Sequence, residues 1–359
     1  MYNVVIIGCG RISHKIAEGV AKNNDRMNLV AICDLLEEKM FEVEKIYNKK
    51  LNNKNSILKY KNYKEMLKQN KIDVAIISTE SGYHEEIGLY CLETKINIII
   101  EKPLAMSIEG AQKLINTANK NNLKLAVSHQ NRFNYPIQLL KKAIKENRLG
   151  KIFNGMARIL WTRDNNYYLQ APWRGTWALD GGTLMNQCIH NIDLINWMMD
   201  DEIDTVYSQT SKYIRNIEAE DYGVIVIRYK SGKIATIEGS AIIYPKNLEE
   251  TLTVTGEKGT VVIGGMAVNK INTWRVEGDN EEEYLSIDCG DPNSVYGYGH
   301  EALYKDFLDA LDENRAPLVD GKAGLEAIKI ILAAYKSQKT GLPIKFDDFY
   351  EFSTLEMVK

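Results

Sequence analysis

The features that this sequence lacks exclude several classes of protein. The 45 lysines and arginines do not outnumber the 48 aspartates and glutamates, so the net charge of −3 provides no basic surface for nucleic-acid phosphates. No apolar run approaches the roughly 20 residues of a membrane-spanning helix. The N-terminal MYNVVIIGCG lacks the cationic start and the small-residue cleavage site of a signal peptide. We therefore expect a cytoplasmic protein with neither a nucleic-acid partner nor a membrane partner.

Cysteine is scarce, and its arrangement argues against cross-links. The five cysteines are scattered, odd in number and free of any CxxC pair. Such a pattern is typical of reduced thiols buried in the core, and it favours neither a disulfide framework nor a zinc site.

What the sequence does contain predicts two domains, because 359 residues exceed the usual size of a single core. In the first third, short runs of valine and isoleucine alternate with amphipathic helical segments. The runs are 4–8, 29–34, 73–79, 97–103 and 123–130. This alternation predicts a parallel sheet covered on both faces, that is, a doubly wound Rossmann domain over residues 1–125.

The pattern changes after Lys151 to longer strands joined by hairpin turns. It predicts an α+β domain over residues 126–359 with a large, open, mostly antiparallel sheet and helices near 301–314 and 321–339. The fold class is therefore α/β, with two different sheets.

A glycine-rich loop follows the first strand and opens the first helix. Gly8 permits a tight turn, and Gly10 lets the backbone approach a pyrophosphate at the helix N-terminus, with the small Ser13 in place of a third glycine. Asp34 ends the second strand, where a carboxylate binds the adenosine ribose. Residues 35–38 contain no arginine for a 2′-phosphate, so NAD is favoured over NADP. The alternative is a plain strand–helix turn with an exposed aspartate.

Polar residues also follow the later parallel strands, at the edge where such sheets bind ligands. Ser78 and Thr79 end one strand, and Glu101 and Lys102 follow the next. A lysine there can donate to a substrate oxygen or act as a base, although a lone lysine is more often an ordinary surface residue. For His84 we consider a contact with the cofactor, and the alternative is a structural or helix-start role.

The segment 167–197 concentrates tryptophan, arginine and histidine around Gly181 and Gly182. Asn186, His190 and Asp193 are spaced to share one helical face, so the histidine could accept an alcohol proton while its neighbours hold its ring. The alternative is a hydrogen-bonded core histidine. No second histidine or paired carboxylate completes a ligand set, so we expect no metal.

These motifs together resemble the Gfo/Idh/MocA family of NAD(P)-dependent sugar oxidoreductases over essentially the whole chain. Within that family, QNRF, YYLQAPWRGTWALDGG, MNQCIHNID and YPKNLEETL resemble the UDP-N-acetylglucosaminuronate 3-dehydrogenase branch, which serves bacterial surface-polysaccharide (O-antigen) biosynthesis. The resemblance implies hydride transfer from sugar C3 to NAD, giving a 3-keto sugar. It makes Lys102 and His190 the catalytic pair, with His190 as the base and the reverse assignment still open. Many members carry aspartate where this chain has Asn186, which leaves Asp193 as the expected residue to orient the histidine.

We expect two sets of ligand contacts. The NAD contacts are Gly8, Gly10, Arg11, Ile12, Asp34, Ser78, Thr79, His84, Glu101, Lys102 and Gln130. The substrate contacts are aromatic faces (Tyr167, Tyr168, Trp173, Trp177), cations (Arg132, Arg163, Arg174) and groups for sugar hydroxyls (Asn131, Gln170, Thr176, Asn186, His190). About half of the aromatic residues are expected to fill the domain junction instead. His300 and Tyr296 could line the same cleft or a subunit contact.

Three functions remain. The first is a UDP-sugar 3-dehydrogenase, the second a dehydrogenase of a free polyol or aldose such as inositol, and the third a non-catalytic NAD-binding sensor. Arginines and aromatics in 161–177 argue against a small uncharged substrate, and the presence of both Lys102 and His190 argues against a sensor. The bare face of the open sheet and the habits of the family predict a homodimer or homotetramer.

Overall fold

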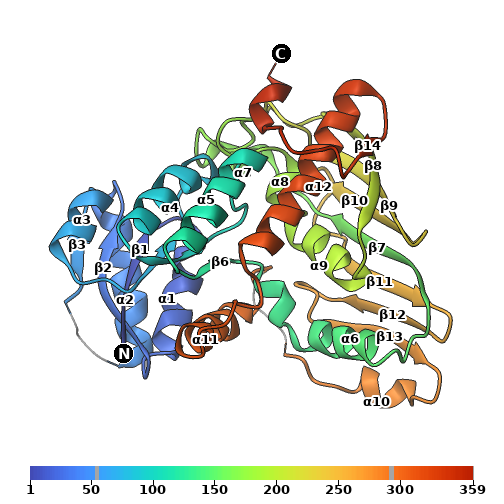
Figure 1. The fold of residues 1–359 in the computed structure, drawn as a ribbon, viewed down its shortest axis with the longest axis horizontal. Helices are drawn as coiled ribbons and strands as arrows, with labels where there is room; N and C mark the ends of the chain where they lie inside the picture. The colour runs from blue at the N-terminus through green and yellow to red at the C-terminus, as the bar shows by residue number, and fades with distance from the viewer. Residues whose placement is uncertain (53–55, 291–294, 359) are drawn as a thin grey trace. The chain divides into compact units, whose positions relative to one another are not determined.

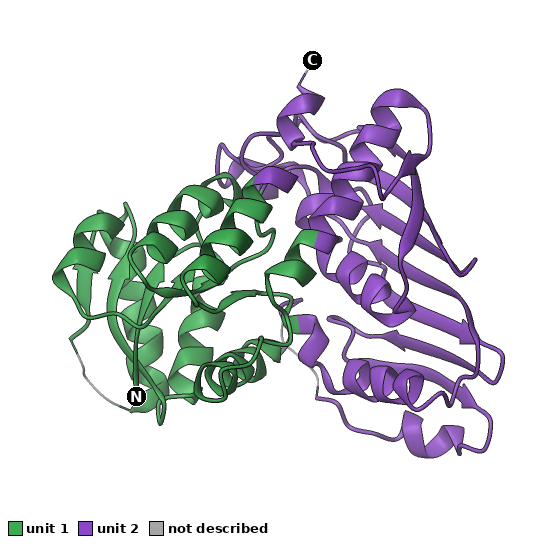
Figure 2. Ribbon diagram, viewed as in Figure 1, with its two compact units in different colours: residues 1–105, 110–130, 298–325 green, residues 106–109, 131–297, 326–359 purple. Residues whose placement is uncertain are grey.

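The chain folds into two compact units (Figure 2). The computed structural model describes residues 1–52, 56–290 and 295–358. Unit 1 comprises residues 1–105, 110–130 and 298–325, and unit 2 comprises residues 106–109, 131–297 and 326–359. Residues 298–325 thus belong to unit 1, although the sequence pattern grouped them with the C-terminal domain.

Unit 1 is built on a six-stranded parallel sheet, which confirms the predicted Rossmann architecture (Figure 1). The strand order is β3-β2-β1-β4-β5-β6. The strands are β1 (Tyr2–Ile7), β2 (Met27–Cys33), β3 (Leu58–Tyr60), β4 (Val74–Ile77), β5 (Asn97–Ile100) and β6 (Leu125–Val127). The apolar centres of β1, β4 and β5 are fully buried because helices cover both faces of a parallel sheet.

The helices of this unit connect successive strands. They are α1 (Ser13–Lys22), α2 (Glu37–Leu51), α3 (Tyr63–Gln69), α4 (His84–Glu93) and most of α5 (Ile108–Lys120), with a 3₁₀ turn at Ser81–Tyr83. Helix α11 (Gly299–Asp312) joins them from far along the sequence and packs against α1.

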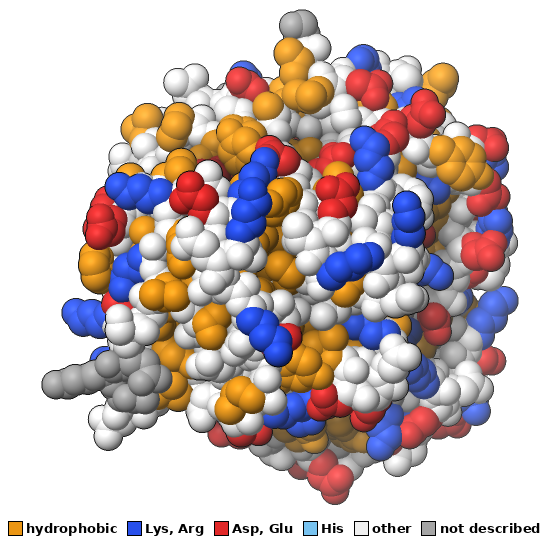
Figure 3. All heavy atoms as spheres, turned by 60° about the vertical axis from the view of Figure 1, so that its left-hand side comes forward, with side chains coloured by type: hydrophobic (Ala, Val, Ile, Leu, Met, Phe, Trp, Pro, Cys, Tyr) orange, Lys and Arg blue, Asp and Glu red, His pale blue; other side chains and the backbone are white. Residues whose placement is uncertain are grey.

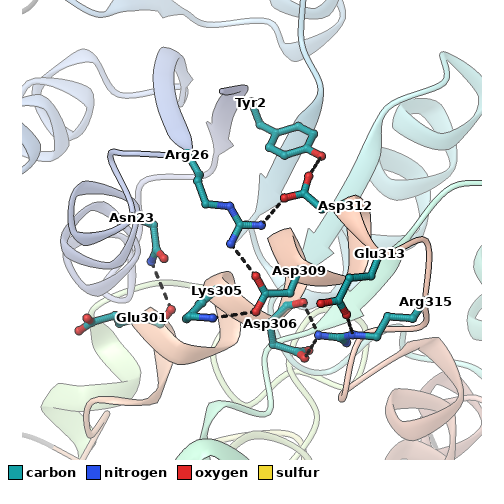
Figure 4. Close-up of polar contacts among 10 residues, drawn as sticks. All are labelled: Tyr2, Asn23, Arg26, Glu301, Lys305, Asp306, Asp309, Asp312, Glu313 and Arg315. Atoms are coloured by element: carbon teal, nitrogen blue, oxygen red, sulfur yellow. Dashed lines mark hydrogen bonds and ion pairs between the residues drawn. The ribbon is translucent and has the colours of Figure 1, made fainter.

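Charged side chains hold α11 in place (Figure 4). Arg26 donates to Asp309 at 2.6 Å and to Asp312 at 2.7 Å, and Tyr2 donates to the other oxygen of Asp312 at 2.6 Å. Gly19 of α1 leaves room for Tyr304 of α11, since a Cβ at Gly19 would lie 2.8 Å from that ring. The return of this helix therefore depends on contacts that no local sequence pattern signals.

Unit 2 is built on an eight-stranded sheet in the order β13-β12-β11-β7-β10-β9-β8-β14. Its strands pair antiparallel except β10 with β7, so the mostly antiparallel sheet is confirmed. The strands are β7 (Ile152–Leu160), β8 (Ile203–Ser211), β9 (Tyr222–Tyr229), β10 (Ile234–Ser240), β11 (Glu249–Gly256), β12 (Gly259–Gly264), β13 (Lys270–Val276) and β14 (Ile344–Lys345).

The helices of this unit are α6 (Tyr135–Lys145), α7 (Asn165–Leu169), α8 (Thr183–Asn186), α9 (Ile189–Met199), α10 (Glu281–Leu285) and α12 (Gly321–Thr340), whose first turn belongs to unit 1. Of these, α6, α8, α9 and α10 contact strands of the sheet. Helix α9 contacts β7, β10 and β11. It approaches the sheet closely because Gly155 and Gly239 have no side chains: a Cβ there would lie 2.4 Å from Ile195 and 2.5 Å from Cys188.

The surface carries both signs of charge. Figure 3 shows lysine and arginine side chains interspersed with aspartate and glutamate over one face. Among the helices that the structure describes, none is long and apolar enough to cross a membrane.

Candidate active site

The glycine loop of unit 1 rests on the end of β4. Gly8 has a φ of +94°, and a Cβ there would lie 2.6 Å from the backbone of Ser78 and Thr79. The Ser78 hydroxyl donates to the Gly8 carbonyl at 2.7 Å. Only glycine fits this turn, and the hydrogen bond from Ser78 holds the loop against the end of β4.

Beyond Gly8 the loop has room for a ligand. A Cβ at Gly10 would lie 4.0 Å from its nearest contact, the Ser78 carbonyl oxygen, and Arg11 is exposed. The Ser13 hydroxyl donates to the Gly10 carbonyl at 2.7 Å, which ties the loop to the helix. Within the described residues no side chain caps the N-terminus of α1, which begins after Ile12. No capping side chain therefore competes with a phosphate for this helix N-terminus.

Asp34 lies beside this loop, as expected of a ribose ligand. One of its carboxylate oxygens accepts from the Cys9 amide at 2.7 Å, and the other accepts from the Leu36 amide at 2.9 Å. A carboxylate has about four acceptor positions. The two amide bonds thus fix the group and leave acceptor capacity for ribose hydroxyls, so these residues fit a dinucleotide.

His84 connects the ends of two neighbouring strands. It is 1% exposed, with Nδ1 2.7 Å from the Pro103 carbonyl and Nε2 3.2 Å from the Thr79 carbonyl. Burial lowers the pKa of this histidine, which keeps the ring neutral. A neutral ring donates from one nitrogen only, and the shorter contact assigns that proton to Nδ1. His84 is thus buried and holds the backbone of Thr79 and Pro103 in place, and its contact with the cofactor stays a prediction.

Glu101 and Lys102 follow β5, and the carboxylate of Glu101 is buried beside His300 of α11 at 3.5 Å. Burial opposes ionisation of Glu101, but the contacts with His300, Lys102 and Ser128 outweigh it and lower the pKa of that carboxyl. Lys102 itself is half-buried. Gln130 is 2% exposed and packs against Gly299, where a Cβ would lie 2.1 Å from the Gln130 carbonyl oxygen. Helix α11 therefore supports this edge of unit 1.

In unit 2, the exposure pattern around the candidate histidine is selective. From Asp180 to Ile195, a stretch that the structure describes completely, every residue is buried except Asn186 and His190. The expected continuous helix is interrupted after Asn186, where α8 ends, and α9 begins at Ile189. The two partly exposed polar side chains are thus held by an otherwise buried framework.

Gly181 and Gly182 form the backbone turn before α8, at two positions where a side chain would not fit. Gly181 has a φ of +77°, and a Cβ at Gly182 would lie 1.6 Å from the carboxyl of Glu220. Glu220 accepts from the Leu184 amide at 2.9 Å and from the Tyr335 hydroxyl at 3.1 Å. Burial raises the pKa of Glu220 to about 8.

Asp193 and Arg132 lie in a different arrangement from the expected one. The Arg132 guanidinium donates to both Asp193 oxygens, at 2.8 and 2.6 Å, and lies 4.8 Å from the ring centroid of Trp197. Both side chains are buried. The carboxylate expected to orient His190 is thus paired with the guanidinium expected to bind substrate, and this bidentate geometry gives both of them a structural position.

Arginines and aromatic rings alternate in the recognition segment. We call Trp161, Arg163, Tyr167, Arg174 and Trp173 the arginine–aromatic stack. Successive guanidinium–ring distances along it are 4.6, 5.3, 4.4 and 4.5 Å. Two of the rings predicted as substrate contacts, Tyr167 and Trp173, therefore lie against guanidinium groups, and the stack holds two cations in fixed planes.

The other expected substrate residues occupy varied positions. Trp177 is a core residue, edge-on to Tyr335 at 5.1 Å, and its carbonyl accepts from Thr354 at 2.6 Å. The Thr176 hydroxyl donates to the Trp173 carbonyl at 2.7 Å. Tyr168 lies edge-on to Tyr167 at 5.1 Å, Gln170 is exposed and Asn131 is buried. Trp177 thus packs inside unit 2, and not at the domain junction that was predicted for some of these aromatics.

Three polar residues escaped sequence reasoning. Asp180 accepts a hydrogen bond from the side chain of Asn186, and Gln187 forms hydrogen bonds with both Asn186 and Arg163. Glu220 places its carboxyl in the space where a side chain at Gly182 would lie. The one sequence feature that could have indicated any of them is Asp180, an acidic residue directly before the paired glycines. Across the described residues, no group of three or more His, Cys, Asp or Glu side chains is placed to hold a metal ion.

Comparisons with known proteins place this chain in a family. Residues 2–129 match the model described as "Oxidoreductase family, NAD-binding Rossmann fold", and residues 141–346 match its "C-terminal alpha/beta domain". The chain belongs to the Gfo/Idh/MocA oxidoreductase family. Unit 1 is accordingly an NAD-binding Rossmann domain, and the protein is an NAD-dependent dehydrogenase of this family, which confirms the expected family and cofactor.

Two solved structures of this family are similar in both fold and sequence. The WlbA dehydrogenases of Bordetella pertussis and Chromobacterium violaceum, both in complex with NADH and UDP-GlcNAcA, are each 32% identical to this chain with a TM-score of 0.84. The match covers 96% of this chain, 98% of the first relative and 95% of the second. Among curated proteins, myo-inositol 2-dehydrogenase of Thermotoga maritima is 24% identical over 96% of this chain and 98% of its own length.

Proposed function

We propose that this protein oxidises the C3 hydroxyl of UDP-N-acetylglucosaminuronate (UDP-GlcNAcA) to the 3-keto sugar. The observation that carries the proposal is the arginine–aromatic stack, which holds Arg163 and Arg174 in fixed planes. Fixed guanidinium groups suit a substrate with a diphosphate and a carboxylate, whereas a free polyol has no anion for them to recognise. The UDP-GlcNAcA found in the two WlbA structures supports the same substrate class.

The reaction divides into a hydride transfer and a proton transfer. Bound NAD⁺ supplies the acceptor for the hydride that leaves C3. We assign the hydroxyl proton to His190, which is partly exposed at the start of α9 and firmly held by its buried neighbours. Lys102, directly after β5, polarises and orients the C3 oxygen through its ammonium group. Asn186 holds a sugar hydroxyl next to the reacting carbon.

A second candidate function is oxidation of a free polyol such as myo-inositol. It is favoured by the myo-inositol 2-dehydrogenase of Thermotoga maritima, which matches this chain over nearly its full length. The same catalytic pair would serve both reactions, so the substrates separate the two candidates.

The experiment is an NADH absorbance assay with UDP-GlcNAcA, myo-inositol and glucose as alternative substrates. We expect NADH to form with UDP-GlcNAcA and free UDP to inhibit competitively. Activity with the free sugars alone, and no inhibition by UDP, would support the second candidate and reject the first.

We also infer that a second copy of the chain covers the outer face of the eight-stranded sheet. Met156, Val226 and Ile234 lie exposed on that face. A homodimer or homotetramer would bury them. Light scattering on the purified protein tests this inference, and a monomer at micromolar concentration contradicts it.

A further inference from the structure

We propose that Asp180 is a positioning residue that fixes the orientation of Asn186 for the reaction. It acts through four side chains that we call the amide relay, in the order Asp180, Asn186, Gln187 and Arg163. The inference rests on the proposed dehydrogenase chemistry at His190, and it concerns residues of unit 2 alone.

The relay is a continuous chain of hydrogen bonds. Asn186 donates from Nδ2 to Asp180 Oδ1, and Asn186 Oδ1 accepts from Gln187 Nε2 at 2.8 Å. Gln187 Oε1 then accepts from Arg163 Nε at 3.1 Å. Asp180 is 2% exposed and Gln187 is 7% exposed, so two of the four members are shielded from water.

The two ends of the relay determine the direction of every bond within it. An ionised aspartate only accepts hydrogen bonds and an arginine only donates them, whereas each amide between them has one accepting and one donating end. If Asn186 turned over, its oxygen would face the Asp180 carboxylate and its nitrogen would face the Gln187 nitrogen. The acceptor at one end and the donor at the other therefore permit one orientation of both amides.

Asp180 also ties the relay to the recognition segment. Its second carboxylate oxygen accepts from the Gly175 amide at 2.7 Å. Gly175 has a φ of +72°, and a Cβ there would lie 2.5 Å from Ile217, so this backbone position is tightly constrained. The other amide hydrogen of Gln187 Nε2 reaches the Tyr167 hydroxyl at 3.0 Å, and that hydroxyl accepts from Arg174 at 2.6 Å. One buried carboxylate thus links the arginine–aromatic stack to Asn186.

Asn186 is the one member of the relay's amide pair that is partly exposed, four positions before His190. A fixed amide offers the substrate a defined pattern of donor and acceptor, whereas a freely turning amide offers either. The Asp180 carboxylate therefore acts on the substrate through the asparagine at position 186.

The test is a double-mutant cycle with Asp180→Asn, Asn186→Asp and the exchanged pair Asp180→Asn/Asn186→Asp. In the exchanged protein, the new amide at position 180 would accept from Gly175 and donate to the new carboxylate at position 186. That carboxylate would still accept from Gln187, so every bond of the relay is preserved. Each single change removes one bond or brings two carboxylates together. We expect each single variant to lose roughly 10- to 100-fold in kcat. The exchanged variant should recover part of that loss, because its carboxylate at position 186 is again fixed in one orientation but has no N–H to offer the substrate.

The pH profile and a matched control distinguish positioning from general destabilisation. In Asn186→Asp the facing carboxylates must share a proton, so its kcat should fall as pH rises, relative to wild type. Asp164→Asn makes the same chemical change at an exposed helix cap of the same segment and should leave kcat unchanged, since asparagine caps equally well. NAD affinity should stay the same in all variants.

Wild-type kcat in Asp180→Asn, or an exchanged variant no better than the single variants, would overturn the proposal. If the wild-type protein oxidises myo-inositol and leaves UDP-GlcNAcA untouched, the proposed substrate is wrong. The cycle is then measured with myo-inositol, and the same recovery is required.

Discussion

The buried pair between Arg132 and Asp193 predicts a specific effect of Asp193→Asn. The substitution keeps the size of the side chain but removes the charge opposite Arg132, a residue that is 7% exposed. It also replaces one accepting oxygen by a donor that faces the donors of Arg132. We therefore expect a loss of stability, while a residue that oriented the catalytic histidine would mainly affect turnover.

The size of the effect follows from the geometry. Both hydrogen bonds are short, at 2.8 and 2.6 Å, which places the two charges about 4 Å apart. At an effective dielectric constant of about 20, such a pair is worth about 4 kcal/mol, in line with the ~3–5 kcal/mol lost when one partner of a buried pair is removed. For a domain of roughly 150–250 residues, that loss lowers Tm on the order of 10 °C.

Tryptophan fluorescence is a suitable assay because all five tryptophans of the chain lie in unit 2. Arg132→Met/Asp193→Leu removes both charges and should recover most of the lost stability. Glu277→Gln breaks an exposed ion pair with Lys258 of the same unit and should change Tm little, since solvent screens such pairs.

We expect folded Asp193→Asn protein to retain kcat within about threefold of wild type at low temperature. The reason is that the Asp193 carboxylate is engaged by Arg132 and takes no direct part in the reaction that we propose. An unchanged Tm together with a loss of kcat of about 100-fold or more would refute this reasoning. That result would return Asp193 to the orienting role that the sequence favoured.

Three further predictions follow from the same structure. Burial raises the pKa of Glu220 and of Glu250 to about 8, so between about pH 5 and pH 8 the folded protein keeps protons that the unfolded chain has released. The free energy of unfolding should therefore fall as pH rises through this window, by up to about 1.4 kcal/mol per pH unit for each group. The double variant Glu220→Gln/Glu250→Gln should show a flatter dependence of Tm on pH. A dependence as steep as that of the wild type would contradict the assignment. Gly8→Ala should destabilise unit 1, because its Cβ would meet backbone at 2.6 Å, whereas Gly10→Ala should preserve Tm and weaken NAD binding at least about tenfold in a titration. His190→Ala should lower kcat about 100- to 10,000-fold with unchanged NAD affinity, and retained turnover would remove it from the catalytic pair.

Much of the fold follows from the sequence because the informative patterns are local. Continuous valine and isoleucine runs separated by helices predict a parallel sheet, and the sheet of unit 1 has that form. The glycine loop was recognisable because Gly8 has no alternative at a φ of +94° beside the β4 backbone. Strand β3 was not predicted, since three residues are too few to form a periodic pattern.

The remainder depends on contacts between distant positions. Arg26 is 283 residues from Asp309, and no local pattern announces that this pair returns α11 to unit 1. Arg132 was predicted to contact the substrate and Asp193 to orient His190, but these two residues are 61 positions apart and bind each other. The i, i+4, i+7 spacing of Asn186, His190 and Asp193 predicted one face of one helix, and the break between α8 and α9 removes that face.

The measurement that tests the central claim most directly uses UDP-GlcNAcA labelled with deuterium at C3. If the enzyme oxidises this carbon, the deuterium moves to the nicotinamide, and mass spectrometry detects deuterated NADH together with a 3-keto sugar nucleotide. Unlabelled NADH, or no turnover while myo-inositol is oxidised, would contradict the proposed reaction.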